Sequence, residues 1–121
     1  MYGLATRYED GIGVKQSDKK GIELYEMAAK RGIANAQFNL GQYYRHGMYG
    51  LTQSPKRAIE YFSLAVEQGF AGAQTSLGIM YANGEGIEQS NSKARELWTK
   101  AAAQGQENAI QNLKIMDESG L

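Results

Sequence analysis

Residues 73–105 read AQTSLGIMYANGEGIEQSNSKARELWTKAAAQG, and the chain repeats the pattern of this segment along its length. Leu77 within the segment is one of four leucines that recur about every 36 residues, the others being Leu4, Leu40 and Leu113. After each of the first three leucines come a Tyr, a Gly-rich turn, a Ser, an aromatic residue, an Ala and a final Gly. Such a period is typical of stacked-repeat proteins, in which each unit buries its apolar face only against its neighbours.

The first half of each unit is predicted to be an amphipathic helix. Within residues 34–46, a step of ~100° per residue places Ala36, Leu40 and Tyr44 on one stripe. Gly41 borders the stripe, and we expect this small residue to let a second helix approach closely. Gly-rich turns are predicted to end these helices. The turns lie at residues 11–13, 47–50 and 84–86.

The second half of each unit is predicted to be a helix that begins at a recurring Ser. Ser17, Ser54 and Ser90 occupy this position, where a hydroxyl can accept a hydrogen bond from the first turn. Pro55, the only proline, follows at the first helical position, where its missing N–H costs nothing. An aromatic residue and an Ala form the predicted buried stripe, and a left-handed Gly ends the helix. These residues are Tyr25, Phe62 and Trp98; Ala28, Ala65 and Ala101; and Gly32, Gly69 and Gly105.

The predicted fold is all-α, with one domain made of antiparallel helix pairs. The 121 residues divide into repeats at about 1–32, 33–69 and 70–105, followed by residues 106–121. In this last segment Lys114 replaces the small residue and Asp117 replaces the Tyr, so it is either a capping helix or a degraded repeat. The first repeat lacks its opening helical turn, and we therefore expect the chain to be a piece of a longer array.

Composition argues against several classes of function. The 13 basic and 13 acidic residues balance, so no overall field would hold nucleic acid or an anionic membrane. No apolar run reaches the ~18 residues of a membrane span, and the first residues do not resemble a signal peptide. The chain contains no Cys, which excludes disulfides and thiol chemistry and is compatible with the cytoplasm, although the compartment stays open. No cofactor or metal site is predicted.

The third copy resembles the Sel-one-like repeat family, a branch of the tetratricopeptide superfamily. The matching residues are Ala73, Leu77, Gly78, Tyr81, Gly84, Gly86, Ile87, Lys93, Ala94, Trp98, Lys100, Ala101, Ala102 and Gly105. The resemblance covers the whole chain, with local departures at Ala5, Gly21 and the extra residue near Tyr49. It implies a right-handed α-solenoid that acts as a scaffold or adaptor for other proteins and has no active site. Some secreted members carry disulfides and are linked to penicillin binding, but this chain lacks those cysteines.

Two alternatives to a scaffold remain at this stage. Residues 17–20 and 90–93 both fit S-x-x-K, the nucleophile motif of penicillin-interacting enzymes, but the accompanying S-D-N and K-T-G are absent. The motif also recurs at the same helix start, which favours capping over an enzyme acting on cell-wall or β-lactam substrates. His46 is the only histidine, and we expect it in the last helical turn rather than at a metal. The other alternative is a structural spacer without a ligand.

The side of the first helix opposite its Leu/Tyr stripe is predicted to bind a protein or peptide. In proteins of the resembled class this side lines the concave surface. Amides, single charges and a few larger apolar groups suit an extended peptide or a partner helix. We name these positions the A-helix surface: Tyr2, Thr6, Glu9, Asn35, Phe38, Gln42, Arg45, Thr75, Ile79, Asn108, Gln111 and Ile115. The alternative is that Phe38 packs against the neighbouring repeat and the surface is inert. Leu4 and Tyr8, at an incomplete end, could also drive self-association.

Overall fold

The computed structural model describes the backbone of residues 12–121 and the side chains from residue 18 onward. This part of the chain is all-α, as predicted, and has no strand. None of its helices has the length and apolar character needed to cross a membrane. The helices are α1 (Ile12–Lys30), α2 (Ala34–His46), α3 (Pro55–Glu67), α4 (Ala71–Asn83), α5 (Asn91–Ala103) and α6 (Glu107–Glu118).

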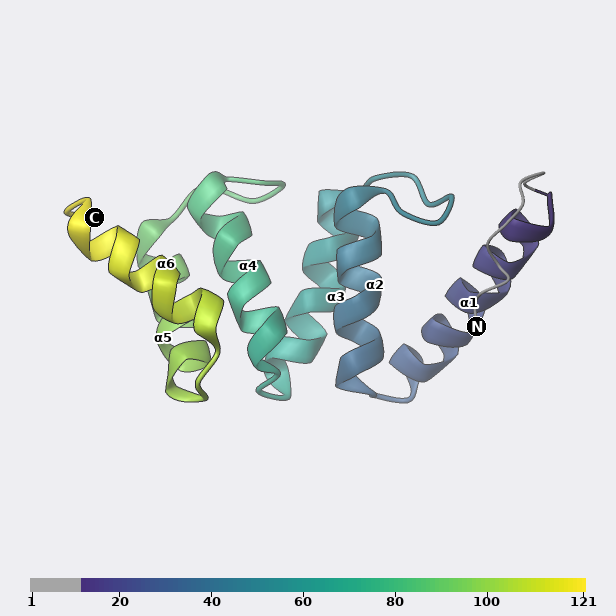
Figure 1. Cartoon of the computed structure of the whole chain (residues 1–121), viewed down its shortest axis with the longest axis horizontal. Helices are drawn as coiled ribbons and strands as arrows, with labels where there is room; N and C mark the ends of the chain where they lie inside the picture. The colour runs from purple at the N-terminus through teal and green to yellow at the C-terminus, as the bar shows by residue number, and fades with distance from the viewer. Residues whose placement is uncertain (1–11) are drawn as a thin grey trace.

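The helices form pairs that follow one another along the long axis of the molecule (Figure 1). Helix α2 packs against α3 and α4 packs against α5, while successive pairs meet through α1 and α2, α3 and α4, and α5 and α6. Tight turns join the pairs at one edge of the array, and longer loops join the helices within a pair at the opposite edge (Figure 1). We call these the turn edge and the loop edge.

The tight turns have the predicted left-handed glycines. Gly32, Gly69 and Gly105 have φ values of 86°, 78° and 86°. At the middle turn, the N–H of Phe70 donates to the carbonyl oxygen of Ala65 at 3.1 Å, and equivalent bonds close the other two turns. This bond satisfies a carbonyl that the end of the helix would otherwise leave free, so the recurring Gly is a requirement of backbone geometry.

The predicted helix starts are confirmed at two positions and wrong at one. Ser54 Oγ accepts from the N–H of Arg57 at 3.2 Å, and Ser90 Oγ accepts from the N–H of Lys93 at 3.1 Å. Ser17, in contrast, lies within α1, which begins at Ile12. Residues 12–16 are helical and run on through Ser17, whereas the residues just before Ser54 and Ser90 are irregular, so only those two serines stand at a helix start. The predicted turn at residues 11–13 is contradicted in its described part, since Ile12 and Gly13 are helical, and Gly11 lies outside the described residues.

The predicted small residues of α2 and α4 are confirmed as points of close helix approach. A Cβ at Gly41 would lie 2.5 Å from the ring of Phe62, and a Cβ at Gly78 would overlap the indole of Trp98. Both rings are buried, and Trp98 Nε1 donates to the carbonyl oxygen of Thr75 at 3.0 Å. Each aromatic side chain of the second helix therefore occupies a notch in the first.

Glutamines connect successive turns, which the sequence analysis did not predict. Gln68 Nε2 donates to the carbonyl oxygen of Gly32 at 2.8 Å and to Gln37 Oε1 at 3.0 Å. One repeat later, Gln104 Nε2 donates to the carbonyl oxygen of Gly69 at 2.9 Å and to Gln74 Oε1 at 3.1 Å. We call this series the glutamine ladder. The regular spacing of these glutamines is visible in the sequence, but the groups to which they donate can be identified only in the folded structure, where successive turns lie side by side.

Candidate partner-binding surface

Helix α2 contributes amide groups to the A-helix surface. Asn35 is exposed, and its Oδ1 accepts from Asn39 Nδ2 at 2.9 Å. Gln42 is half-buried, and its Oε1 is buried without receiving a hydrogen bond from any described residue. An acceptor removed from water without a donor is costly. Gln42 therefore carries an unsatisfied acceptor that a ligand N–H group can reach only if the side chain turns outward.

Phe38 packs between repeats, as the alternative in the sequence analysis proposed. Its ring centroid lies 5.2 Å from that of Phe70 and 5.9 Å from that of Phe62. A Cβ added at Gly72 would lie 3.3 Å from the Phe38 ring. Much of this side chain is consequently occupied in joining α2 to the pair that follows, and only its remaining exposed part can contact a ligand.

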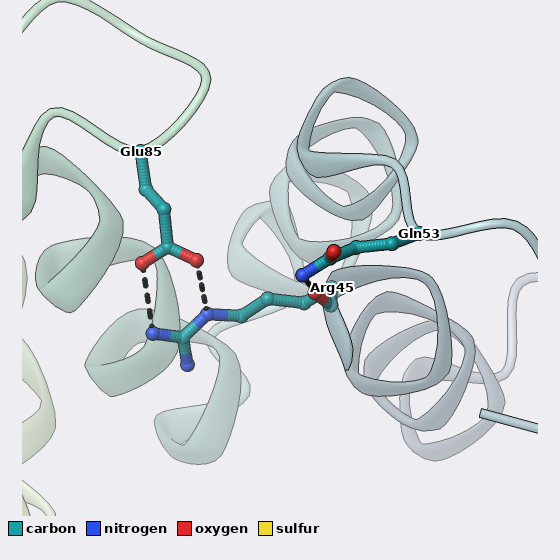
Figure 2. Close-up of polar contacts among 3 residues, drawn as sticks. All are labelled: Arg45, Gln53 and Glu85. Atoms are coloured by element: carbon teal, nitrogen blue, oxygen red, sulfur yellow. Dashed lines mark hydrogen bonds and ion pairs between the residues drawn. The ribbon is translucent and has the colours of Figure 1, made fainter. Parts of the chain in front are cut away.

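Arg45 is paired within the protein (Figure 2). Its Nε and Nη2 atoms donate to the two carboxylate oxygens of Glu85 at 2.8 and 2.9 Å, and Gln53 Nε2 donates to the Arg45 carbonyl oxygen at 2.9 Å. The hydrogen bonds from Arg45 lower the pKa of the Glu85 carboxyl group below its usual 4.5, against the opposing effect of burial. Arg45 thus joins α2 to the loop that follows α4, and Glu85 already neutralises its charge.

The prediction for Thr75 is wrong. Its side chain is 4% exposed, and its hydroxyl lies 2.9 Å from Gln106 Oε1 and 3.1 Å from the Ala71 carbonyl oxygen. Helix α4 packs against α3 on one side and against its partner α5 on the other, which buries Thr75 in a way that a helical wheel of α4 alone does not reveal. Ile79, also on α4, is half-buried and packs against the cluster that includes Trp98.

Helix α6 carries the most accessible part of the predicted surface. Asn108 and Gln111 are exposed, and Ile115 is 57% exposed although it is apolar. Together with Asn35 and Gln42 on α2, these residues make up the available A-helix surface. Three other predicted members, Tyr2, Thr6 and Glu9, lie outside the described residues.

An open hollow of about 250 Å³ lies among α4, α5 and α6. Its lining residues are Ala82, Asn83, Asn91, Trp98, Asn112, Ile115, Met116, Ser119 and Leu121.

We call the contact of α4 and α5 with α6, where the hollow lies, the outer junction, and the contact of α2 and α3 with α4 the inner junction. Apart from Ile115, the sequence analysis missed this site. The sequence feature that indicates this hollow is Ala82, a small residue at the position that Arg45 takes one repeat earlier.

The motifs that suggested chemistry have structural roles where they are described. The Ser90 hydroxyl caps α5, and the Lys93 ammonium lies 5.6 Å from the centre of the Tyr81 ring. The side chain of Ser17 lies outside the described residues. His46 lies in the last turn of α2, and the described side chains include no group of His, Asp and Glu that could hold a metal ion.

Helix pairs stacked in register through tight glycine turns define an α-solenoid. The Sel1 repeat model matches residues 1–33, 34–70 and 71–106, so the chain belongs to the Sel1 repeat family. Members of this family generally act as protein-interaction scaffolds, and their fold is typically non-enzymatic.

Solved structures and a sequence relative agree with this assignment. The protective antigen c5321 of uropathogenic Escherichia coli, described as having an SLR fold, is 37% identical with a TM-score of 0.78 over 82% of this chain and 21% of its own. A Sel1 repeat protein from Oxalobacter formigenes is 30% identical with a TM-score of 0.82 over 93% of this chain and 45% of its own. Chitin synthase regulatory factor 3 of Schizosaccharomyces pombe is 38% identical over the whole chain, which spans only 13% of that protein.

Proposed function

We propose that the chain binds an extended peptide segment of a partner protein along the available A-helix surface. The observation that carries the proposal is the unsatisfied side chain of Gln42 at a half-buried position of α2, whose Oε1 is closed off from solvent and receives no hydrogen bond from any described residue. We infer that this side chain turns outward when a peptide binds, so that a main-chain N–H group of the peptide satisfies the acceptor. The exposed amides of Asn35, Asn108 and Gln111 offer further donors and acceptors along the same surface.

A protein partner also agrees with the relatives. The Schizosaccharomyces pombe protein is named as a regulatory factor of an enzyme, chitin synthase, which fits a protein partner. Repeat arrays present long surfaces made of many weak contacts, which suits a segment of chain better than a small molecule. The partner of the present chain is therefore sought among proteins.

Selection from a random-peptide phage library, followed by NMR titration of a selected peptide, tests the proposal. We expect shifts in the side-chain amide signals of Gln42 and Gln111. Gln42→Ala and Gln111→Ala should each weaken binding roughly two- to tenfold, the usual effect of removing one neutral hydrogen bond. The matched controls Glu60→Ala and Lys100→Ala alter exposed positions on α3 and α5 and should leave the affinity unchanged.

The opposite pattern would contradict the proposal. If a selected peptide loses affinity with the α3 and α5 controls and keeps it with the Gln42 and Gln111 variants, binding uses the second helices of the repeats. Thermal melting of each variant separates a loss of binding from a loss of folding.

A further inference from the structure

We propose that the hollow of the outer junction is an anchor pocket for one uncharged apolar side chain of the bound peptide. The inference rests on the proposed function, because it places one residue of that peptide. Ile115 belongs both to the lining of the hollow and to the A-helix surface. A peptide that follows this surface along α6 therefore passes the opening.

Equivalent positions close the two junctions differently. Arg45 and Ala82 both stand two residues before the glycine that ends their helix, Gly47 and Gly84 respectively. At the inner junction, the Arg45 side chain spans the space to Glu85 (Figure 2). Ala82 is too short to do the same at the outer junction.

At the outer junction Ala82 thus stands in place of Arg45, and Leu121 stands in place of Glu85. Gly84 and Gly120 have φ values of 67° and 76°, and the residue after each donates its N–H to the fifth residue before it. The distances are 2.9 Å from Glu85 to Met80 and 3.0 Å from Leu121 to Met116. The backbones match, so an ion pair has been replaced by two apolar side chains that line the hollow.

The lining selects for an uncharged apolar side chain. Buried Trp98 and Met116 contribute apolar surface, as do the other apolar lining residues. Three asparagines and one serine add amide and hydroxyl groups that can pair with a peptide main chain. None of the nine lining side chains is charged, so a charged anchor would lose its hydration without gaining a partner, whereas an apolar anchor gains from burial.

The size of the hollow fits a side chain better than a whole ligand. Its volume of about 250 Å³ is smaller than the ~300–1,000 Å³ of pockets for drug-sized molecules. It is also open to solvent, which allows a residue to enter while its main chain stays outside. The expected anchor is a residue such as Leu, Ile or Phe.

The test uses capped peptides acetyl-Ser-Gly-X-Gly-Ser-amide, in which X is Leu, Ala, Lys or Glu. Trp98 is the only tryptophan, so its fluorescence reports on the hollow without ambiguity. We expect saturable binding of the Leu peptide, about tenfold tighter than that of the Ala peptide. The Lys and Glu peptides should bind more weakly than the Leu peptide, and the NMR signals of Asn83 and Asn112 should move with the fluorescence.

A double variant, Ala82→Arg with Leu121→Glu, recreates the inner ion pair at the outer junction and should abolish the preference for Leu. The matched control, Ala103→Arg with Ile110→Glu, makes the same chemical change at exposed positions that do not line the hollow and should keep the preference. If the filled variant does not fold, Ser119→Phe blocks the hollow from the exposed end of α6 without adding a second tryptophan and should have the same effect.

Three results would overturn the inference: equal binding of the Leu, Ala and Lys peptides, unchanged Leu binding by the folded filled variant, or a Trp98 signal that changes with protein concentration alone. The last result would assign the hollow to a second copy of this chain. A phage-selected peptide that still depends on Gln42 but ignores the filled hollow would refute the anchor pocket and leave the proposed function standing.

Discussion

The inner and outer junctions use the same backbone plan but close their loop edges differently. At the inner junction, Arg45 pairs with Glu85, and Gly86 lies against Pro55, where an added Cβ would be 2.5 Å from the proline ring. At the outer junction, Ala82 leaves a hollow. A repeat array can therefore keep its stacking while a few changed side chains open a site.

The largest expected effect concerns the glycine notches. Gly41→Ala should destabilise the fold by roughly 1–3 kcal/mol, because the new methyl group would meet the buried Phe62 ring. Gly78→Ala should cost a similar amount through Trp98. Urea denaturation measures both free energies of unfolding.

Two controls connect this prediction to the comparison. Gly21→Ala lies in α1 with no atom within 4 Å of the new methyl group, and it should stabilise by roughly 0.5–1 kcal/mol. Lys114 takes in α6 the position that Gly41 has in α2, but it is exposed, so Lys114→Ala should change stability by less than about 0.5 kcal/mol. A stabilising Gly41→Ala would mean that α2 and α3 are farther apart than described.

A smaller effect is expected at the turn edge. Gln104→Ala removes the donor to the Gly69 carbonyl oxygen and to the buried side chain of Gln74. We expect a loss of about 1–2 kcal/mol, since a largely buried acceptor is left without its partner. Gln104→Glu is the matched control for side-chain length and should not restore stability, because it cannot donate. Equal stability of all three proteins would show that the glutamine ladder contributes nothing.

The smallest effect distinguishes the ion pairs of the two junctions. Glu85→Gln should cost about 0.5–1 kcal/mol, whereas Asp117→Asn, which breaks the more exposed pair with Arg95, should cost less than about 0.5 kcal/mol. The pKa of Glu85 is lower in the folded protein than its usual 4.5, so the ion pair stabilises the folded state above pH 4.5. This contribution is lost as the pH falls through the folded pKa of Glu85.

The measurement is thermal melting from neutral pH down to the acid transition, with and without added salt. The Glu85→Gln variant should lose less stability than the native protein below pH 4.5. Parallel curves for the two proteins would contradict the assigned role of the carboxylate. Salt should reduce the difference between them, since screening weakens exposed pairs.

The sequence predicted those parts of the fold that depend on local geometry or on the period. Gly69 needs a left-handed backbone, Ser54 caps its own helix, and Gly41 faces an aromatic residue at a fixed offset, so each can be inferred from residue type and spacing. The start of α1 was mispredicted because the role of Ser17 was transferred by analogy with Ser54 and Ser90, whereas the residues before Ser17 are themselves helical.

The candidate site was less predictable because it depends on neighbouring repeats. A helical wheel placed Thr75 on an open surface, but the helices on both sides of α4 bury it. The same wheel treated Arg45 as free, although its partner Glu85 lies 40 residues away in a loop. The hollow forms because Ala82 is shorter than the arginine at the equivalent position of the inner junction. The absence of a long side chain is noticed only when equivalent positions of the two junctions are compared.

The distribution of cross-links between the two edges has a mechanical consequence. At the turn edge, the ring of Phe38 packs against Phe70 at the inner junction, and Thr75 contacts Gln106 at the outer junction. At the loop edge of the outer junction, the polar contacts between α5 and the end of the described chain are the exposed ones of Arg95 to Asp117 and to the Leu121 carbonyl oxygen. We therefore expect α6 to tilt about the turn edge more readily than α4 does. An inserted side chain would act as a wedge that sets the angle, and the curvature of the array would report that the site is filled.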